Sequence, residues 1–377
     1  MRNVGEDGLC SDMCPEKERY LRENQRRLSP FEVLSSGNKV FDHSRAVKEY
    51  IRSSADQDMP PPEELRPANV LEMTMDYLLS DVINKGGPGM WGEWYNFLWN
   101  RMRAIRKDIV QQRLCNERAV QLTEKSTRFH ILCSAMLCEE DPSVFDQKIN
   151  SENLTKCLQS LKELYHDLSL KGIHCCHEAE FRGYMILMNL NNADILSEAQ
   201  HWPEHILRSE FVVRSIAVHT AVTSNNYVKF FRIVRQSSFL TSCILHRYFN
   251  QMRMVAVKRV AKAFYPSASP GIIMVRMMEQ LGYDNMNDFN ELLTHFNLSP
   301  QMSNINRTTN TFDCIIINGR SNRIVESEQV LPARKSFTLV ECKITSSLGE
   351  VRLFVRPSVC LSVCCNHKSP FYSIPVT

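Results

Sequence analysis

The chain has 377 residues, of which 43% are hydrophobic and 23% are charged, and its formal net charge is +3. This composition is ordinary for a globular protein, and the length suffices for two or three domains with a full core. No apolar run reaches the ~18–20 residues that a membrane-spanning helix requires, and the N-terminus lacks the apolar core of a signal peptide, so we expect no membrane insertion. The fourteen cysteines mostly occur singly within helical patterns, which indicates reduced thiols in the cytosol or nucleus.

The N-terminal segment, residues 1–66, contains two cysteines near its start and ends in a proline-rich linker. Cys10 and Cys14 have a spacing that could supply half of a zinc site, but no second Cys/His pair follows at finger spacing. Packing of both thiols against the domain is therefore the favoured interpretation. Residues 57–67 are expected to be extended, because each proline restricts itself and the residue before it.

Two helices are expected next, at residues 67–84 and 91–114, with a Gly-Gly-Pro-Gly break between them. The second is the central helix of the chain, because its apolar residues share one stripe: Trp94, Leu98, Met102, Ile105 and Ile109. Arg103, Arg106 and Lys107 lie on the opposite face. That face is either the solvated back of a core helix or a contact surface for a protein partner or RNA.

Two charged residues, Arg101 and Asp108, lie at the edge of the apolar stripe of the central helix. Charged side chains are buried only when they are paired, so each is expected to pair with the other or with a neighbour. We predict that Asp108 is buried and ion-paired, and we assign Arg101 and Asp108 as a structural ion pair.

Residues 67–264 are predicted to form a helical solenoid of the TPR type, because helix follows helix with short polar breaks. Asn116 is a plausible cap for the first of these later helices, Asn150 or Ser151 for the second, and Gly172 ends the second. The predicted helices are 117–138, 152–171, 181–189, 211–223, 227–236 and 239–264.

The pattern changes in residues 265–351. Two short helices are expected at 270–281 and 285–296, followed by strands at 312–318 and 336–344. Helices followed by a β pair are the order of a winged helix. The fold class is thus all-α: a TPR-like, PCI-type helical solenoid that ends in a winged-helix subdomain with a small β wing. Residues 352–377 have a low-complexity composition and are predicted to be an unstructured or non-native tail.

One long segment of the chain is purely basic. Residues 211–278 contain no Asp or Glu but ten Lys and Arg residues, so the rest of the chain carries a net charge of −7. A solvated face normally mixes both signs, so this segment indicates phosphate binding without sequence reading, or an acidic protein partner. The aromatic residues between the cations are expected to be core. The nucleic-acid-binding residues are predicted to be Arg253, Lys258, Arg259, Lys262 and Arg276.

The sequence shows no recognisable set of catalytic residues. It also contains no phosphate-binding loop motif and no nucleophile-elbow motif. Residues 174–177 (HCCH) are interpreted as an interhelical turn, because adjacent side chains cannot all converge on one metal. His130 and Cys133 are one helical turn apart, but a nucleophilic pair needs an orienting third group and a cleft. We predict that the chain is not an enzyme and has no cofactor.

Several motifs together carry a family resemblance. They are residues 8–19 (GLCSDMCPEKER), 46–50 (AVKEY), 52–56 (RSSAD), 64–67 (ELRP), 94–97 (WYNF), 105–108 (IRKD), 155–163 (TKCLQSLKE) and 180–184 (EFRGY). In this order and spacing the chain resembles the SAC/GANP/Xmas family, whose members are scaffolds of the TREX-two nuclear mRNA-export complex. The match covers most of residues 5–300.

The resemblance implies a nuclear scaffold, at the pore side of the nuclear envelope and also in the cytoplasm. The partners it implies are a second PCI-domain protein, a small acidic DSS-type protein, RNA and nuclear pore components. Centrin and ENY-type proteins would bind only if a C-terminal region that this sequence lacks exists, and the chain is interpreted as a fragment or a partial gene model. The alternative function is a PCI interaction subunit without RNA contact, as in proteasome-lid or centrosomal assemblies.

Overall fold

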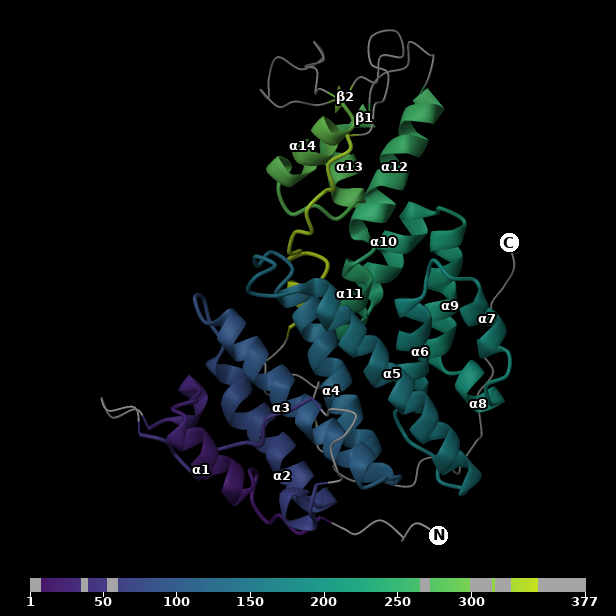
Figure 1. Ribbon diagram of the computed structural model, residues 1–377. Helices are drawn as coiled ribbons and strands as arrows, with labels where there is room; N and C mark the ends of the chain where they lie inside the picture. The colour runs from purple at the N-terminus through teal and green to yellow at the C-terminus, as the bar shows by residue number, and fades with distance from the viewer. Residues whose placement is uncertain are drawn as a thin grey trace.

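The computed structural model describes residues 8–34, 40–52, 60–264, 272–298, 314–315 and 327–344, and almost all regular structure within them is helical (Figure 1). None of the helices in these ranges is long and apolar enough to cross a membrane. The helices are α1 (Glu16–Asn24), α2 (Ala68–Tyr77), α3 (Trp91–Gln111), α4 (Glu117–Met136), α5 (Gln147–Leu170), α6 (Glu178–Met188), α7 (Asp194–Ala199), α8 (Glu204–Leu207), α9 (Glu210–Thr223), α10 (Tyr227–Gln236), α11 (Phe239–His246), α12 (Phe249–Phe264), α13 (Met274–Gln280) and α14 (Met286–His295).

The central helix forms as predicted. The apolar stripe of α3 is buried along its whole length, from Trp94 to Ile109. The indole nitrogen of Trp94 donates to the carbonyl oxygens of Val82 and Ile83, at 3.2 and 3.1 Å, and so fixes α3 against the end of the preceding helical segment. That segment continues α2 as a π-turn (Leu78–Val82) and a 3₁₀ turn (Ile83–Lys85), close to the predicted range 67–84.

The ends of α4 and α5 agree in part with the prediction. Asn116 caps α4, since its side chain accepts from the backbone N–H of Ala119 at 2.9 Å. The cap predicted for α5 is wrong, because Asp146 caps the helix, which therefore begins earlier. Asn150 lies inside α5 and bonds His130 of α4, so its polar side chain serves a tertiary contact. Gly172 ends α5 with φ +76°, as expected.

The following helices pack against one another, α4 on α5, α6 on α9 and α9 on α10, which is consistent with a helical solenoid. The predicted helix 239–264 is wrong as one element, because it is split into α11 and α12 at Arg247 and Tyr248. Neither glycine nor proline marks this break. Tyr248 is buried there and donates its hydroxyl to the carbonyl oxygen of Met188, a tertiary contact that no local pattern reveals. The short helices α7 and α8 were not predicted either.

Beyond α12, two short helices lie beside a small β pair. Strand β1 (Ile272–Ile273) pairs antiparallel with β2 (Cys314–Ile315), with Ile272 opposite Ile315. The helix predicted at 270–281 therefore begins only with α13, after β1. Asn285 caps α14 through the backbone N–H of Asp288. The strand predicted at 312–318 contains β2, and the rest of that range lies outside the described residues, as does the tail 352–377.

The second predicted strand, 336–344, is wrong. Residues 331–344, which we call the clasp segment, form turns and one 3₁₀ turn (Glu341–Lys343). The buried residues Ser336, Leu339 and Val340 recur at the spacing of a helical turn, while Phe337 between them is 64% exposed. The residue types of this segment favour a strand, but its contacts with distant helices determine its conformation.

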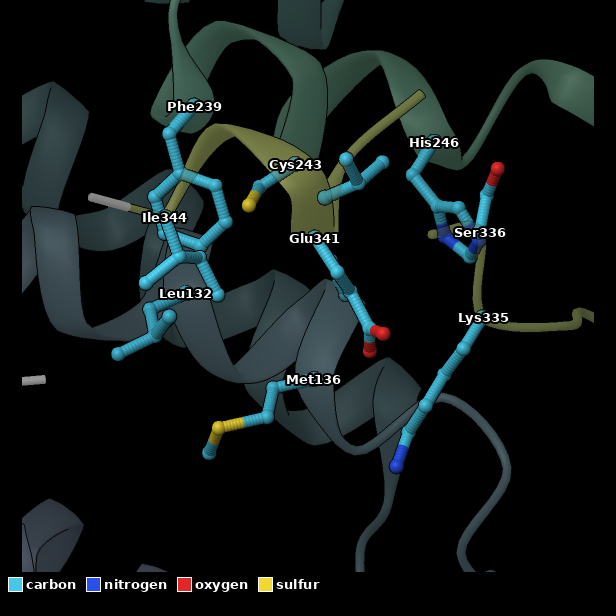
Figure 2. Close-up of a pocket in the computed structure, with 11 residues that line it drawn as sticks. Leu132, Met136, Phe239, Cys243, His246, Lys335, Ser336, Glu341 and Ile344 are labelled. Carbon is cyan, nitrogen blue, oxygen red and sulfur yellow. The ribbon is translucent and has the colours of Figure 1, made fainter. Parts of the chain in front are cut away.

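The clasp segment links the turn after α13 to α11. The Asp284 carboxylate, after α13, accepts from the backbone N–H groups of Phe337 and Thr338 at 2.7 and 2.9 Å. Lys343 donates to the Ser242 hydroxyl of α11 at 2.6 Å. Figure 2 shows the segment beside apolar side chains of two helices, Leu132 of α4 and Phe239 and Cys243 of α11.

Candidate nucleic-acid interface

The predicted interface centres on α12, whose two faces differ. Its inner face is apolar and packs on α10: Phe249, Met252, Ala256, Val257 and Ala261 are buried. The aromatic residues of the basic segment form this core, since the ring centroids of Phe231 and Phe249 lie 5.8 Å apart. The expectation that the aromatics are structural is therefore confirmed at these positions. The outer face carries the cations.

Arg253 does not lie on the outer face. Its side chain is 3% exposed, and its guanidinium donates to the carbonyl oxygens of Leu281 and Gly282, at 3.2 and 2.8 Å. It also lies 3.8 Å from the ring centroid of Tyr283. Burial lowers the pKa of Arg253. Arg253 is thus a strut between α12 and the turn after α13, and its assignment as a phosphate contact is wrong.

The other three predicted residues of α12 are exposed. The ammonium nitrogen of Lys258 lies 6.0 Å from the ring centroid of Phe296, after α14. Arg259 donates to the carbonyl oxygen of Ser224, in the loop before α10, at 3.1 Å. Lys262 lies in the last turn of the helix. These contacts leave the three cationic groups at the surface.

Arg276 is exposed on α13, and α10 adds further exposed cations, Lys229 and Arg232. Arg235 of α10 donates to the carbonyl oxygens of Glu279 and Gln280, so the C-terminal end of α13 is tied to α10. The α10 cations belong to the basic segment predicted from the sequence, but they were not assigned to the site. Their place beside α12 depends on helix packing, which the sequence pattern does not reveal.

We call the exposed cations Lys258, Arg259, Lys262 and Arg276 the basic face. Among the described residues, no ion pair joins Arg259, Lys262 or Arg276 to a carboxylate. Cations without a neutralising partner attract polyanions at low ionic strength, and they contact phosphate without reading bases. The chemistry that this arrangement supports is electrostatic binding.

The assigned ion pair, Arg101 with Asp108, is wrong as a pair, although both residues are buried and ion-paired. The Asp108 carboxylate, 0% exposed, accepts from Lys48 at 2.7 Å and from Arg66 at 2.8 Å. Arg101 pairs with Glu32 at 3.3 Å and with Glu49 at 3.2 Å. The partners come from the N-terminal segment, which folds against α3, so a pattern within one helix could not identify them.

The N-terminal cysteines pack as expected. Cys14 lies against Phe41 and Ala46, and burial raises the pKa of its thiol. The HCCH turn places His177 beside the buried Glu124, with Nδ1 and the carboxylate 3.0 Å apart. The part of the chain that the structure describes contains no group of three or more His, Cys, Asp or Glu side chains that could hold a metal ion.

His130 and Cys133 have an orienting group that the sequence did not reveal. The Nδ1 atom of His130 lies 2.8 Å from the Asn150 amide oxygen. However, both residues are buried. Burial lowers the pKa of His130 to about 4 and raises that of the Cys133 thiol, which disfavours the thiolate and imidazolium forms. A cysteine nucleophile needs the opposite shifts, so His130 and Asn150 form a core hydrogen bond and Cys133 packs in the hydrophobic core.

Comparisons with known proteins agree on one family. The model of the SAC3/GANP family matches residues 13–302. Protein xmas of Drosophila melanogaster is 39% identical over 353 residues, covering 91% of this chain and 16% of the fly protein. SAC3 family protein B of Arabidopsis thaliana is 34% identical over 266 residues, covering 66% of this chain and 15% of the plant protein.

A third relative is SAC3 family protein 1 of Schizosaccharomyces pombe. It is 33% identical over 277 residues, covering 68% of this chain and 27% of the yeast protein. The chain therefore spans only a small part of the length of these three relatives. The family model nevertheless covers most of the chain, including α3, α12 and α13. This chain belongs to the SAC3/GANP family.

Proposed function

We propose that this chain is a non-enzymatic scaffold of nuclear mRNA export that binds RNA through the basic face. The observation that carries the proposal is the exposure of Lys258, Arg259, Lys262 and Arg276, all within a segment that has no acidic residue. Membership of the SAC3/GANP family supports the scaffold role and the nuclear location.

The proposed architecture is a PCI-type solenoid that ends in a winged helix. The order α12, β1, α13, α14, β2, with β1 and β2 antiparallel, supports this interpretation. The basic face then lies on the winged helix and at its junction with the solenoid. Docking beside the winged helix of a second PCI protein would extend the face, and a small acidic DSS-type protein and nuclear pore components are the further proposed partners.

The test is charge reversal on the basic face. A variant with Lys258, Arg259, Lys262 and Arg276 all changed to Glu is assembled with the PCI companion, and its affinity for single-stranded RNA is measured at moderate salt. Binding at moderate salt should be strongly weakened while the fold persists, because exposed charges contribute little to stability. The control reverses four exposed cations of the solenoid, Arg118, Lys148, Lys162 and Arg208, three of which pair with carboxylates.

Wild-type RNA affinity in the basic-face variant would contradict the proposal. If the variant instead failed to assemble with the PCI companion, the cations would belong to a protein interface. The alternative function, a PCI interaction subunit that does not bind RNA, would then be favoured. Because phosphate contacts carry no base information, the wild-type complex should bind uridine-rich and cytidine-rich RNA with similar affinity.

A further inference from the structure

A groove runs between α3 and α5, with α4 contributing to its floor. It encloses about 550 Å³ and is lined by residues of all three helices. Neither the RNA-binding proposal nor the family comparison assigns it a role. The side chains that determine its chemistry are Arg103, Arg106, Lys107 and Val110 of α3, and Lys156 and Glu163 of α5. We call it the α3–α5 groove.

The two walls of the groove run in the same direction. At one end, the Tyr95 hydroxyl of α3 donates to the side-chain oxygen of Asn150, near the start of α5, at 3.1 Å. At the other end, Lys171, just after α5, donates to the carbonyl oxygen of Cys115, just after α3, at 3.4 Å. Residues 103–107 therefore lie toward the N-terminal half of α5, and residues 110–115 lie toward its C-terminal half.

The first end of the groove is basic, and two of its cations are held in place. The guanidinium of Arg103 lies 3.9 Å from the ring centroid of Tyr50, and the ammonium of Lys107 donates to the carbonyl oxygen of Ile51 at 2.8 Å. Neither contact neutralises the charge. Within the described residues, no carboxylate forms an ion pair with Arg103, Arg106, Lys107 or Lys156. Fixed, partly buried cations favour an anion more than mobile surface lysines do.

The second end is apolar and acidic. Val110 is 71% exposed beside Leu114 and Leu164, and the carboxylates of Glu163 and Asp167 line the same end. An RNA strand along the whole groove would bring phosphates against these two carboxylates. A peptide avoids that conflict, because it can present carboxylates to the basic end and an apolar side chain to the other.

We propose that the α3–α5 groove binds a short acidic segment of a partner protein. The segment's carboxylates pair with Arg103, Arg106 and Lys156, and an apolar side chain that follows them covers Val110. This site is separate from the basic face on α12 and α13. It gives two of the three cations on the back of the central helix, Arg103 and Arg106, a protein-binding role.

The first experiment selects ligands without assuming their sequence. Random short peptides displayed on phage are panned against the full chain, and enriched sequences should combine Asp or Glu with a neighbouring Leu, Ile or Phe. The affinity of one enriched peptide, synthesised with a fluorophore, is then measured by anisotropy. Lys156→Glu and Arg103→Glu should each weaken its binding by about tenfold or more.

The chain supplies a matched control. Lys148 and Lys156 are both exposed lysines of α5, but only Lys156 lines the groove. Lys148→Glu should leave the peptide affinity unchanged. Val110→Asp should weaken binding without affecting the fold, because the Val110 side chain is largely exposed. Circular dichroism of each variant should show that the helices are retained.

Equal peptide affinity for the Lys148 and Lys156 variants would overturn the proposal, as would enriched sequences without acidic residues. Loss of oligouridylate binding in the Lys156 variant, without selection of acidic peptides, would show that the groove is a nucleic-acid site. Because the basic-face variant leaves the groove intact, it should still bind the enriched peptide. The RNA-binding proposal can therefore fail while the peptide-binding proposal holds, and the two outcomes are distinguishable.

Discussion

At the scale of single residues, the buried charges that fix the N-terminal segment to α3 are the most sensitive point of the structure. Asp108 neutralises Arg66, and both side chains are fully buried. Asp108→Ala leaves the Arg66 cation without its carboxylate, which should lower the free energy of unfolding by about 3–5 kcal/mol. Urea denaturation measures this decrease, with Asp141→Ala, at an exposed aspartate, as the control. Equal stability of the two variants would contradict the burial of Asp108.

The pair of His177 and Glu124 predicts a pH dependence at the same scale. The hydrogen bond to Glu124 raises the pKa of His177. A histidine whose pKa is raised in the folded state contributes stability that is complete below its unfolded pKa of about 6.5 and is lost as the pH rises through the folded pKa. His177→Gln should therefore destabilise the protein more near pH 6 than near pH 9. His166→Gln, at an exposed position on α5, is the control, and an equal effect of His177→Gln at both pH values would refute the pairing.

At the scale of elements, the clasp segment offers two neighbouring side chains with opposite environments. Leu339 is fully buried against Gly282, whereas Phe337 is largely exposed. Leu339→Ala should cost about 2–5 kcal/mol through the cavity it leaves, and Phe337→Ala should cost about 0.5 kcal/mol or less. Thermal unfolding followed by circular dichroism distinguishes the two. The larger destabilisation in the Phe337 variant would show that the clasp segment does not pack as described.

The elements also show what local sequence pattern can determine. The apolar stripe of α3, the Asn116 cap and the stop at Gly172 were predictable, because each depends on residues within one or two helical turns. The break before Tyr248 and the path of the clasp segment depend on contacts with distant helices. Arg253 was misplaced for the same reason, since only the approach of the turn after α13 buries it. Exposure of Lys258, Arg259 and Lys262 followed from helical periodicity alone.

At the scale of the whole molecule, a basic segment is set against an otherwise acidic chain. Residues 211–278 carry a charge of +10 within a total of +3. Much of that charge is gathered on α10, α12 and α13, whereas α3 and its ion-paired N-terminal segment lie in the lower part of the view in Figure 1. The solenoid thus separates the basic face from the α3–α5 groove. This arrangement suits a scaffold that holds two different ligands.

The salt dependence of RNA binding tests the central claim most directly. The logarithm of the RNA affinity of the complex with the PCI companion is measured against the logarithm of salt concentration, for the wild type and for the basic-face variant. Removing one phosphate-binding cation should reduce the steepness of the slope by roughly 0.7. We therefore predict a shallower slope for the basic-face variant and an unchanged slope for the solenoid control. Identical slopes for the wild type and the basic-face variant would show that RNA binds elsewhere.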